Sequence, residues 1–153
     1  MYAIMGITGQ VGGATARTLI KEGKRVRGIV RDKAKASAWE AAGVELAVAD
    51  AGDAAALEAA FRGAEGVFLM VPPNFAPAPG YAESRTIVAA LRLALDATRP
   101  NKAVHLSSIG AQRKKGLGPH HSGPHFGTGT LLPVGSQRFH SSCLVYGKLP
   151  MGR

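Results

Sequence analysis

The stretch MYAIMGITGQVGGATARTLIKEGKRVRGIVRD, residues 1–32, decides the fold. A short apolar run at Tyr2–Met5 is followed at once by glycines, as a buried strand would be. Residues 10–22 then carry apolar side chains at helical spacing, and Gly23 predicts the end of that helix. The β-branched run at residues 26–30 predicts a second strand. A strand, a glycine-rich turn, a helix and a strand in this order indicate a βαβ unit with parallel strands.

The same alternation continues to residue 107. Further elements are expected as helices at residues 33–42, 54–61 and 81–97, and as strands at residues 44–49, 66–71 and 103–107. Asp53 is expected to cap the helix at 54–61, because its carboxylate can accept from amides of the first turn. Right-handed crossovers between parallel strands give a doubly wound sheet of order 3-2-1-4-5. We therefore predict an α/β, Rossmann-type domain over residues 1–112, with a sheet that is incomplete on its C-terminal side.

The glycine-rich turn carries the strongest chemical signal. Gly6, Gly9 and Gly12 are spaced three apart, directly after the first strand and at the start of the helix. Gly6 permits the tight turn, Gly9 lets the backbone approach a pyrophosphate, and Gly12 lets the helix pack closely on the strand. The helix N-terminus offers amides to phosphates, and Thr8 and Gln10 can add side-chain contacts. With a strand before and a helix after, this pattern predicts a dinucleotide site.

The second strand ends in IVRD, and Arg31 stands where an NAD-preferring site usually has an acid. Arginine pairs in bidentate fashion with a phosphate, and Lys33 and Lys35 follow closely. This favours NADP as the cofactor and leaves NAD as the alternative, because Asp32 is next to Arg31. The other interpretation is that these cations only decorate a solvated helix start.

Two further positions follow strand ends. Asp50 closes the third predicted strand, where it either touches the adenine edge, through its side chain or the following amide, or caps the turn. Residues 72–79 hold four prolines and are predicted to form a loop over the cofactor at the switch point of the sheet.

Several segments together resemble the NmrA-like group of atypical short-chain dehydrogenases. They are GITGQVGG, VRGIVRD, VELAVADAGDAAALEAAFRGAEGVFLMVPP and VHLSSIGA, within residues 1–112. The resemblance implies a Rossmann domain with a smaller C-terminal substrate region. One branch of that group contains NADPH-dependent quinone oxidoreductases, which act on small molecules. Another contains regulators that bind NAD(P) as a redox signal and act through a protein partner. The cofactor contacts that the resemblance implies are Gly6, Thr8, Gly9, Gln10, Val11, Gly12, Arg31 and Lys35.

No catalytic residue is assigned from the sequence. Ordinary short-chain dehydrogenases use a Tyr-x-x-x-Lys pair, whereas Tyr146 and Lys148 are spaced Y-x-K. Ser107 and Ser108 follow the fifth predicted strand, where a polar active-site group or a turn cap is expected. His105 lies within that strand, which favours a packed core histidine over a ligand. Both an NAD(P)H-dependent oxidoreductase and a non-catalytic redox sensor therefore remain open.

Residues 113–153 differ sharply in composition. The first 112 residues hold 13 Lys and Arg, all 10 Asp and Glu, and 26 alanines, whereas the last 41 hold 6 Lys and Arg, no acid and no alanine. The family pattern also stops there. We expect an irregular or disordered basic tail rich in Gly, His and Pro, and our hypothesis is a shift of reading frame after about Lys115 that truncates the native protein. A disordered native tail is the alternative.

The composition narrows the partners and the compartment. The tail histidines at 120, 121, 125 and 140 lack a helical or zinc-finger setting, so no metal site is predicted. Its charges are scattered among few aromatic residues, which argues against nucleic acid. A lone cysteine, Cys143, and a start without the features of a secretory signal fit the cytoplasm. No apolar run is long enough for a membrane span.

Overall fold

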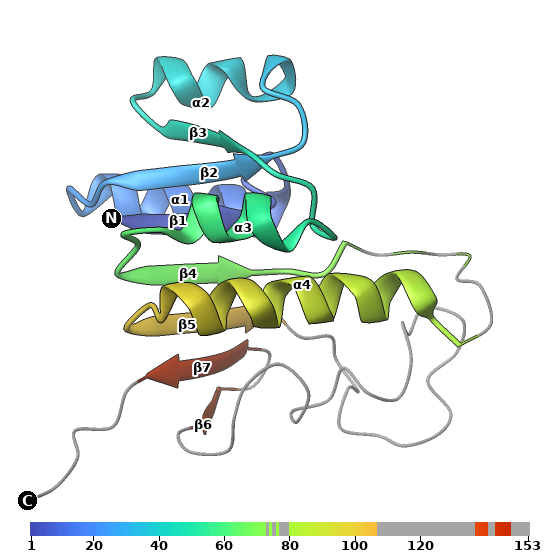
Figure 1. Ribbon diagram of the computed structural model, residues 1–153. Coiled ribbons are helices and arrows are strands. Elements are labelled where there is room, and N and C mark those ends of the chain that lie inside the picture. Colours follow the sequence, from blue (N-terminus) through green and yellow to red (C-terminus); the bar gives the residue numbers. More distant parts are fainter. Residues whose placement is uncertain (73, 75, 77–79, 107–136, 141–142, 148–153) are drawn as a thin grey trace, which may run out of the picture.

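The computed structural model describes residues 1–72, 74, 76, 80–106, 137–140 and 143–147. Its centre is one sheet with the strand order β3-β2-β1-β4-β5-β7-β6 (Figure 1). The first five strands pair in parallel and confirm the predicted order 3-2-1-4-5. They are β1 (Tyr2–Met5), β2 (Val26–Val30), β3 (Glu45–Val48), β4 (Gly66–Leu69) and β5 (Lys102–Leu106).

Helices cover both faces of this sheet. Figure 1 shows α3 and α4 in front of the strands and α1 behind them. The helical elements are α1 (Gln10–Lys21), a 3-10 turn at Ala34–Ala36, α2 (Ser37–Ala41), α3 (Ala54–Phe61) and α4 (Ala82–Thr98). The parallel strands therefore lie between two helical layers, as in a doubly wound α/β fold.

Alternation along β1 creates two cores. Ala3 and Met5 point to one face and pack with residues of α3 and α4, whereas Ile4 points to the other face and packs with Ala16 of α1. Each face is apolar because successive side chains of a strand point in opposite directions. The central strand β4 is buried along its whole length, as expected for a parallel strand covered on both sides.

The helix ends follow local chemistry. The Asp53 carboxylate accepts hydrogen bonds from the first-turn amides of Ala55 and Ala56, both at 3.0 Å, which confirms the predicted cap of α3. The helix α4 ends at Thr98, one residue later than predicted, and Arg99 adopts a left-handed conformation with φ of 45°. Pro100 follows, and proline disfavours a helical residue before it.

The last two strands differ from the prediction of an irregular tail. In the structure, β7 (Cys143–Gly147) pairs antiparallel with β5, and β6 (Gln137–His140) pairs with β7. An uncovered β5 would present a row of unpaired N–H and C=O groups, and an extended segment that lies alongside satisfies them. β5 thus has a paired strand on each of its edges. The proposed frame shift near Lys115 lies outside the described residues and stays a prediction.

Candidate dinucleotide-binding site

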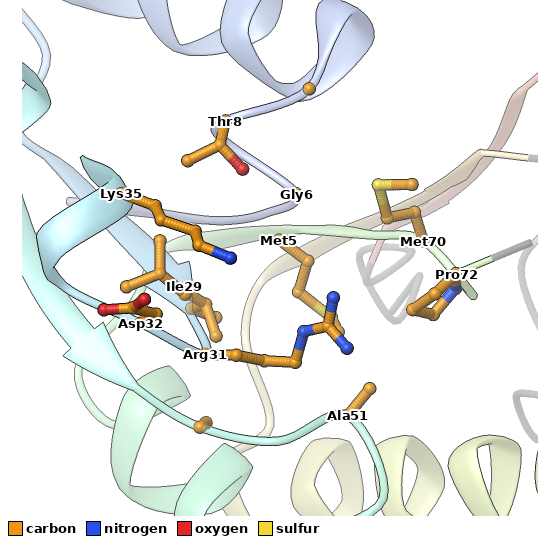
Figure 2. A pocket seen from close by; sticks show the side chains of 13 residues that line it. Met5, Gly6, Thr8, Ile29, Arg31, Asp32, Lys35, Ala51, Met70 and Pro72 are labelled. Carbon is orange, nitrogen blue, oxygen red and sulfur yellow. The ribbon is translucent and has the colours of Figure 1, made fainter.

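A cavity of about 570 Å³ lies at the carboxyl ends of the parallel strands (Figure 2). It includes the point between β1 and β4 at which the strand order reverses, where open α/β sheets bind their ligands. Elements far apart in the sequence contribute to it. The lining residues are Met5, Gly6, Thr8, Gly9, Ile29, Val30, Arg31, Asp32, Lys35, Ala49, Ala51, Met70 and Pro72.

The glycine turn owes its shape to two close approaches. Gly6 has φ of +65°, in the left-handed region that favours glycine. Gly12 faces the same turn, since a Cβ there would collide with the Gly6 carbonyl oxygen and lie 2.8 Å from that of Met5. Only a residue without a side chain lets α1 start this close to β1. The predicted roles of these two glycines as turn former and packing residue are confirmed by this geometry.

The N-terminal end of α1 presents backbone N–H groups toward the glycine turn. Gly9 is the N-cap in an extended conformation, without a side-chain cap, and its carbonyl accepts from Gly13 at 2.9 Å. The amides of the first turn therefore have no acceptor within the helix, and the positive end of the helix dipole adds to them. The side chains of Gln10 and Val11 are exposed and do not line the cavity, and Gly12 is buried behind it. The predicted cofactor contacts of these three residues therefore stay predictions, and no side chain of theirs supports them.

Two cations point into the cavity. Figure 2 shows the Arg31 guanidinium and the Lys35 ammonium directed toward its centre, from the end of β2 and from the following 3-10 turn. The neighbouring Asp32 uses its Oδ1 to accept from the amide of Ala34 at 2.9 Å. One carboxylate oxygen of Asp32 is thus engaged by its own turn. Among the described residues, the recorded ion pairs involve neither Arg31 nor Lys35.

Asp50 caps the turn after β3. Its Oδ1 accepts from the Gly52 amide at 2.8 Å, and its carbonyl accepts from the Asp53 amide at 3.1 Å. Of the two roles predicted for Asp50, the structure shows the capping of the turn. Asp50 itself does not line the cavity, but its neighbours Ala49 and Ala51 do. The contact with an adenine edge stays a prediction.

Sequence reasoning missed the apolar part of the lining. Met5 and Met70 follow from no motif, although both lie at strand ends next to the glycine turn. A general signal was present, because the carboxyl ends of β1, β2 and β4 converge at the switch point. From the loop predicted at residues 72–79, Pro72 reaches the cavity.

Residues 2–94 match the sequence model of the NmrA-like family. The chain belongs to that family. A curated relative, quinone oxidoreductase 2 of Escherichia coli strain K12, is 42% identical over 72 residues, which are 46% of this NmrA-like chain and 25% of the relative. The chain therefore spans about a quarter of the length of that curated relative.

Solved structures share the fold of this chain. NADPH-dependent quinone oxidoreductase from Escherichia coli, in complex with NADPH, superposes with a TM-score of 0.65 and 29% identity, over 80% of this chain and 41% of that one. Triphenylmethane reductase from Citrobacter sp., in complex with NADP(H), has a TM-score of 0.65 and 23% identity, over 78% and 42% of the two chains. The second likeness shows the fold alone. Both structures are of chains more than twice as long as the part that this NmrA-like chain matches.

The remaining candidates from the sequence are a histidine in β5 and polar residues after it, and His105 does not line the cavity. His105 is 4% exposed within β5, and burial lowers the pKa of its imidazole. Its position in the strand agrees with the expectation of a packed core histidine. Ser107 and Ser108, like the histidines at 120, 121 and 125, lie outside the described residues.

The described residues offer neither a metal site nor a membrane span. Within that part of the chain, no group of three or more His, Cys, Asp or Glu side chains is placed to hold a metal ion. No helix there is long and apolar enough to cross a bilayer.

Proposed function

We propose that this NmrA-like chain binds NADP(H), with the pyrophosphate on the first turn of α1 and the adenosine 2′-phosphate between Arg31 and Lys35. One observation carries the proposal: both cations enter the same cavity as the glycine turn. A guanidinium forms two parallel hydrogen bonds to a phosphate, and the lysine adds a point charge beside it. Oδ1 of Asp32 already accepts a hydrogen bond from the Ala34 amide. That oxygen is less available to a ribose hydroxyl of NAD, which supports NADP as the cofactor.

The residues present fit a dinucleotide. A Cβ on Gly6 or Gly12 would collide with atoms around the turn, and Gly6 and Gly9, just before α1, line the cavity. This supports a pyrophosphate at the free amides of the first turn of α1. The Thr8 hydroxyl lies at the same rim as a further donor to phosphate oxygens. Ala51, the residue after Asp50, lines the cavity, which supports its amide as the group that contacts the adenine edge.

We further propose that the whole protein is an NAD(P)H-dependent oxidoreductase that reduces a small molecule such as a quinone. The identity of 42% to a quinone oxidoreductase over 72 residues supports this reaction class. When bound, the cofactor supplies the hydride, which is the demanding chemistry of such a reaction. The described residues of this chain bind and orient the cofactor, and none of them is assigned a proton-transfer role.

Arg31→Asp tests the cofactor assignment. The Kd values of NADPH and NADH are measured by calorimetry for the wild type, for Arg31→Asp and for Lys33→Asp. Loss of the bidentate pair should weaken NADPH by about 30-fold, since hydrogen bonds to charged groups contribute about 2 kcal/mol. NADH should weaken by only a few-fold. Lys33→Asp makes the same charge change on a side chain that does not line the cavity, so it should change both much less.

Equal losses of NADPH and NADH in Arg31→Asp would remove that residue from the 2′-phosphate role. A loss in Lys33→Asp as large as in Arg31→Asp would show a general charge effect. If neither dinucleotide binds the wild type at millimolar concentration, the proposed binding function is wrong.

The reaction itself is tested by NADPH oxidation with a panel of quinones, followed by the absorbance of the reduced cofactor. Turnover of a quinone supports the oxidoreductase. Binding of NADPH without turnover of any quinone would contradict the enzyme proposal for this chain. That outcome would favour the redox-sensing module with a protein partner that the sequence left open.

A further inference from the structure

The thioether of Met70 lies directly over the glycine turn. β4 ends at Leu69, and Met70 is the next residue, beside the β1 end that leads into Gly6. A Cβ on Gly6 would collide with the Met70 sulfur and lie 3.3 Å from its Cγ. The sulfur therefore packs against the backbone of the turn itself. Met70 is partly exposed and lines the cavity (Figure 2), so a small reagent in the cavity can reach it.

We propose that Met70 is a site of oxidation by peroxides, and that its sulfoxide lowers the affinity of the cavity for NADP(H). The inference rests on the proposed binding function. A lone pair of the sulfur attacks one peroxide oxygen, so that an S–O bond forms while the O–O bond breaks. The sulfur loses two electrons, and the second oxygen leaves with the electron pair of the O–O bond. The proton of the attacked oxygen passes, through solvent, to the leaving oxygen, which departs as water, or as an alcohol from an organic peroxide. The product is polar and chiral, and methionine sulfoxide reductases reverse it.

The packing leaves the new oxygen few places. On the side of Gly6 there is no room, because even a methyl group on that residue would collide with the sulfur. On the other side, the oxygen projects into the cavity beside the first turn of α1, where the pyrophosphate is proposed to bind. A sulfoxide oxygen carries partial negative charge, which opposes an anion at the same donors. Oxidation of Met70 therefore disfavours binding of the cofactor.

A second methionine in the same cavity provides an internal comparison. Met5 also lines it but is 5% exposed, at the end of β1. Susceptibility to oxidation follows exposure. The structure thus predicts that Met70 reacts before Met5, and that a bound dinucleotide covers Met70 and slows its reaction.

The experiment uses the full chain with Cys143→Ser, which removes the thiol as a competing target. Samples are treated with hydrogen peroxide, with and without NADP⁺, and the oxidised methionines are located by peptide mass spectrometry. Calorimetry then gives the Kd of NADP⁺ before and after treatment. We expect Met70 to be oxidised before Met5, NADP⁺ to slow the oxidation of Met70, and the Kd to rise about tenfold. A methionine sulfoxide reductase should restore the original Kd.

Two variants separate this effect from general damage. Met70→Leu conserves volume and removes the sulfur, so its own treated and untreated samples should give the same Kd. Met70→Gln places a polar group on an unbranched chain and should weaken NADP⁺ without any peroxide.

Each remaining outcome is decisive. Oxidation of Met5 before Met70, no protection by NADP⁺, or an unchanged Kd after complete oxidation of Met70 would each overturn this inference while leaving the proposed function intact. A peroxide-dependent loss of binding in Met70→Leu would also overturn it. If the untreated protein does not bind NADP⁺, the proposed function fails, and this inference fails with it.

Discussion

Alanine at Gly12 should destabilise the fold, although alanine is the better helix former. In an isolated helix the change would stabilise by about 1 kcal/mol. Here the added methyl would collide with the Gly6 carbonyl oxygen, and it would lie 2.7 Å from the Gly6 carbonyl carbon and 2.8 Å from the Met5 oxygen. These are backbone atoms of the turn, and favourable carbon contacts need about 3.5 Å. The helix α1 must therefore move away from β1 by about 0.5–1 Å.

Overpacking of this kind costs about 1–3 kcal/mol, and backbone neighbours place Gly12 at the upper end. Against the gain in helix propensity, we expect a net loss of about 2 kcal/mol in the free energy of unfolding. For a chain of this length, that loss lowers Tm by about 6 °C. Thermal and guanidinium unfolding, followed by circular dichroism, measure both quantities.

Gly9→Ala is the matched control, because a Cβ there meets only the Gly6 oxygen, at 3.3 Å, with φ of −89°. Its unfolding free energy should stay within about 0.5 kcal/mol of wild type. Its NADPH Kd should rise at least about tenfold, since the methyl projects where the pyrophosphate is proposed to approach. A Gly12→Ala protein as stable as wild type would refute the packing argument, and an unchanged Kd in Gly9→Ala would refute the pyrophosphate position.

Two other changes test the fold around the site. Arg27 joins three elements, since its Nε pairs with Glu45 at 2.7 Å while its Nη1 donates to the carbonyls of Ala60 and Arg62. Arg27→Met should therefore lower the unfolding free energy by about 2 kcal/mol. Glu45→Gln, at a half-exposed carboxylate, should lower it by about 0.5 kcal/mol. Equal losses in the two variants would contradict the role of the two carbonyls. Burial lowers the pKa of His105 below the ordinary 6.5 in the folded state, so stability is full above pH 6.5 and falls as the pH drops toward the folded-state pKa. His105→Gln, which does not titrate, should show a shallower loss of Tm between pH 7 and 5, and an identical slope would contradict the argument.

The strands were predictable because burial on both faces makes parallel strands apolar throughout. The central strand β4 (Gly66–Leu69), which is buried at every residue, lies within its predicted bounds for this reason. The third strand begins one residue later than predicted, at Glu45. Val44 is apolar and buried, but its amide donates to the carbonyl of Trp39 at 3.0 Å and thereby closes the end of α2. A hydrophobic residue is expected to be buried, but its side chain does not determine which carbonyl accepts from its backbone amide. The strand boundary was therefore misplaced by one residue.

The candidate site divides in the same way. The positions of the glycines and of Arg31 were predictable because each depends on a few neighbours in sequence, a strand before and a helix after. The position of Met70 over Gly6 was not, because it depends on the register between β1 and β4, whose paired residues lie 64 positions apart. Asp50 shows an intermediate case, in which both alternatives were visible and the hydrogen bond to Gly52 identified one of them.

Glycine content by itself does not make a site, and the two glycine-rich segments of this chain show why. In residues 6–13, each close approach is fixed by an element on either side: β1 ends at Met5, and α1 begins at Gln10. At Gly12, backbone atoms of the turn occupy the space that a side chain would need, and at Gly6 the Met70 side chain occupies it. The stretch from Gly116 to Gly129 is also rich in glycine, with five in 14 residues, but prolines precede and follow His120 and His121 and no strand or helix is predicted beside it. The proposed phosphate site is therefore at residues 6–13, where a strand and a helix hold the glycine turn.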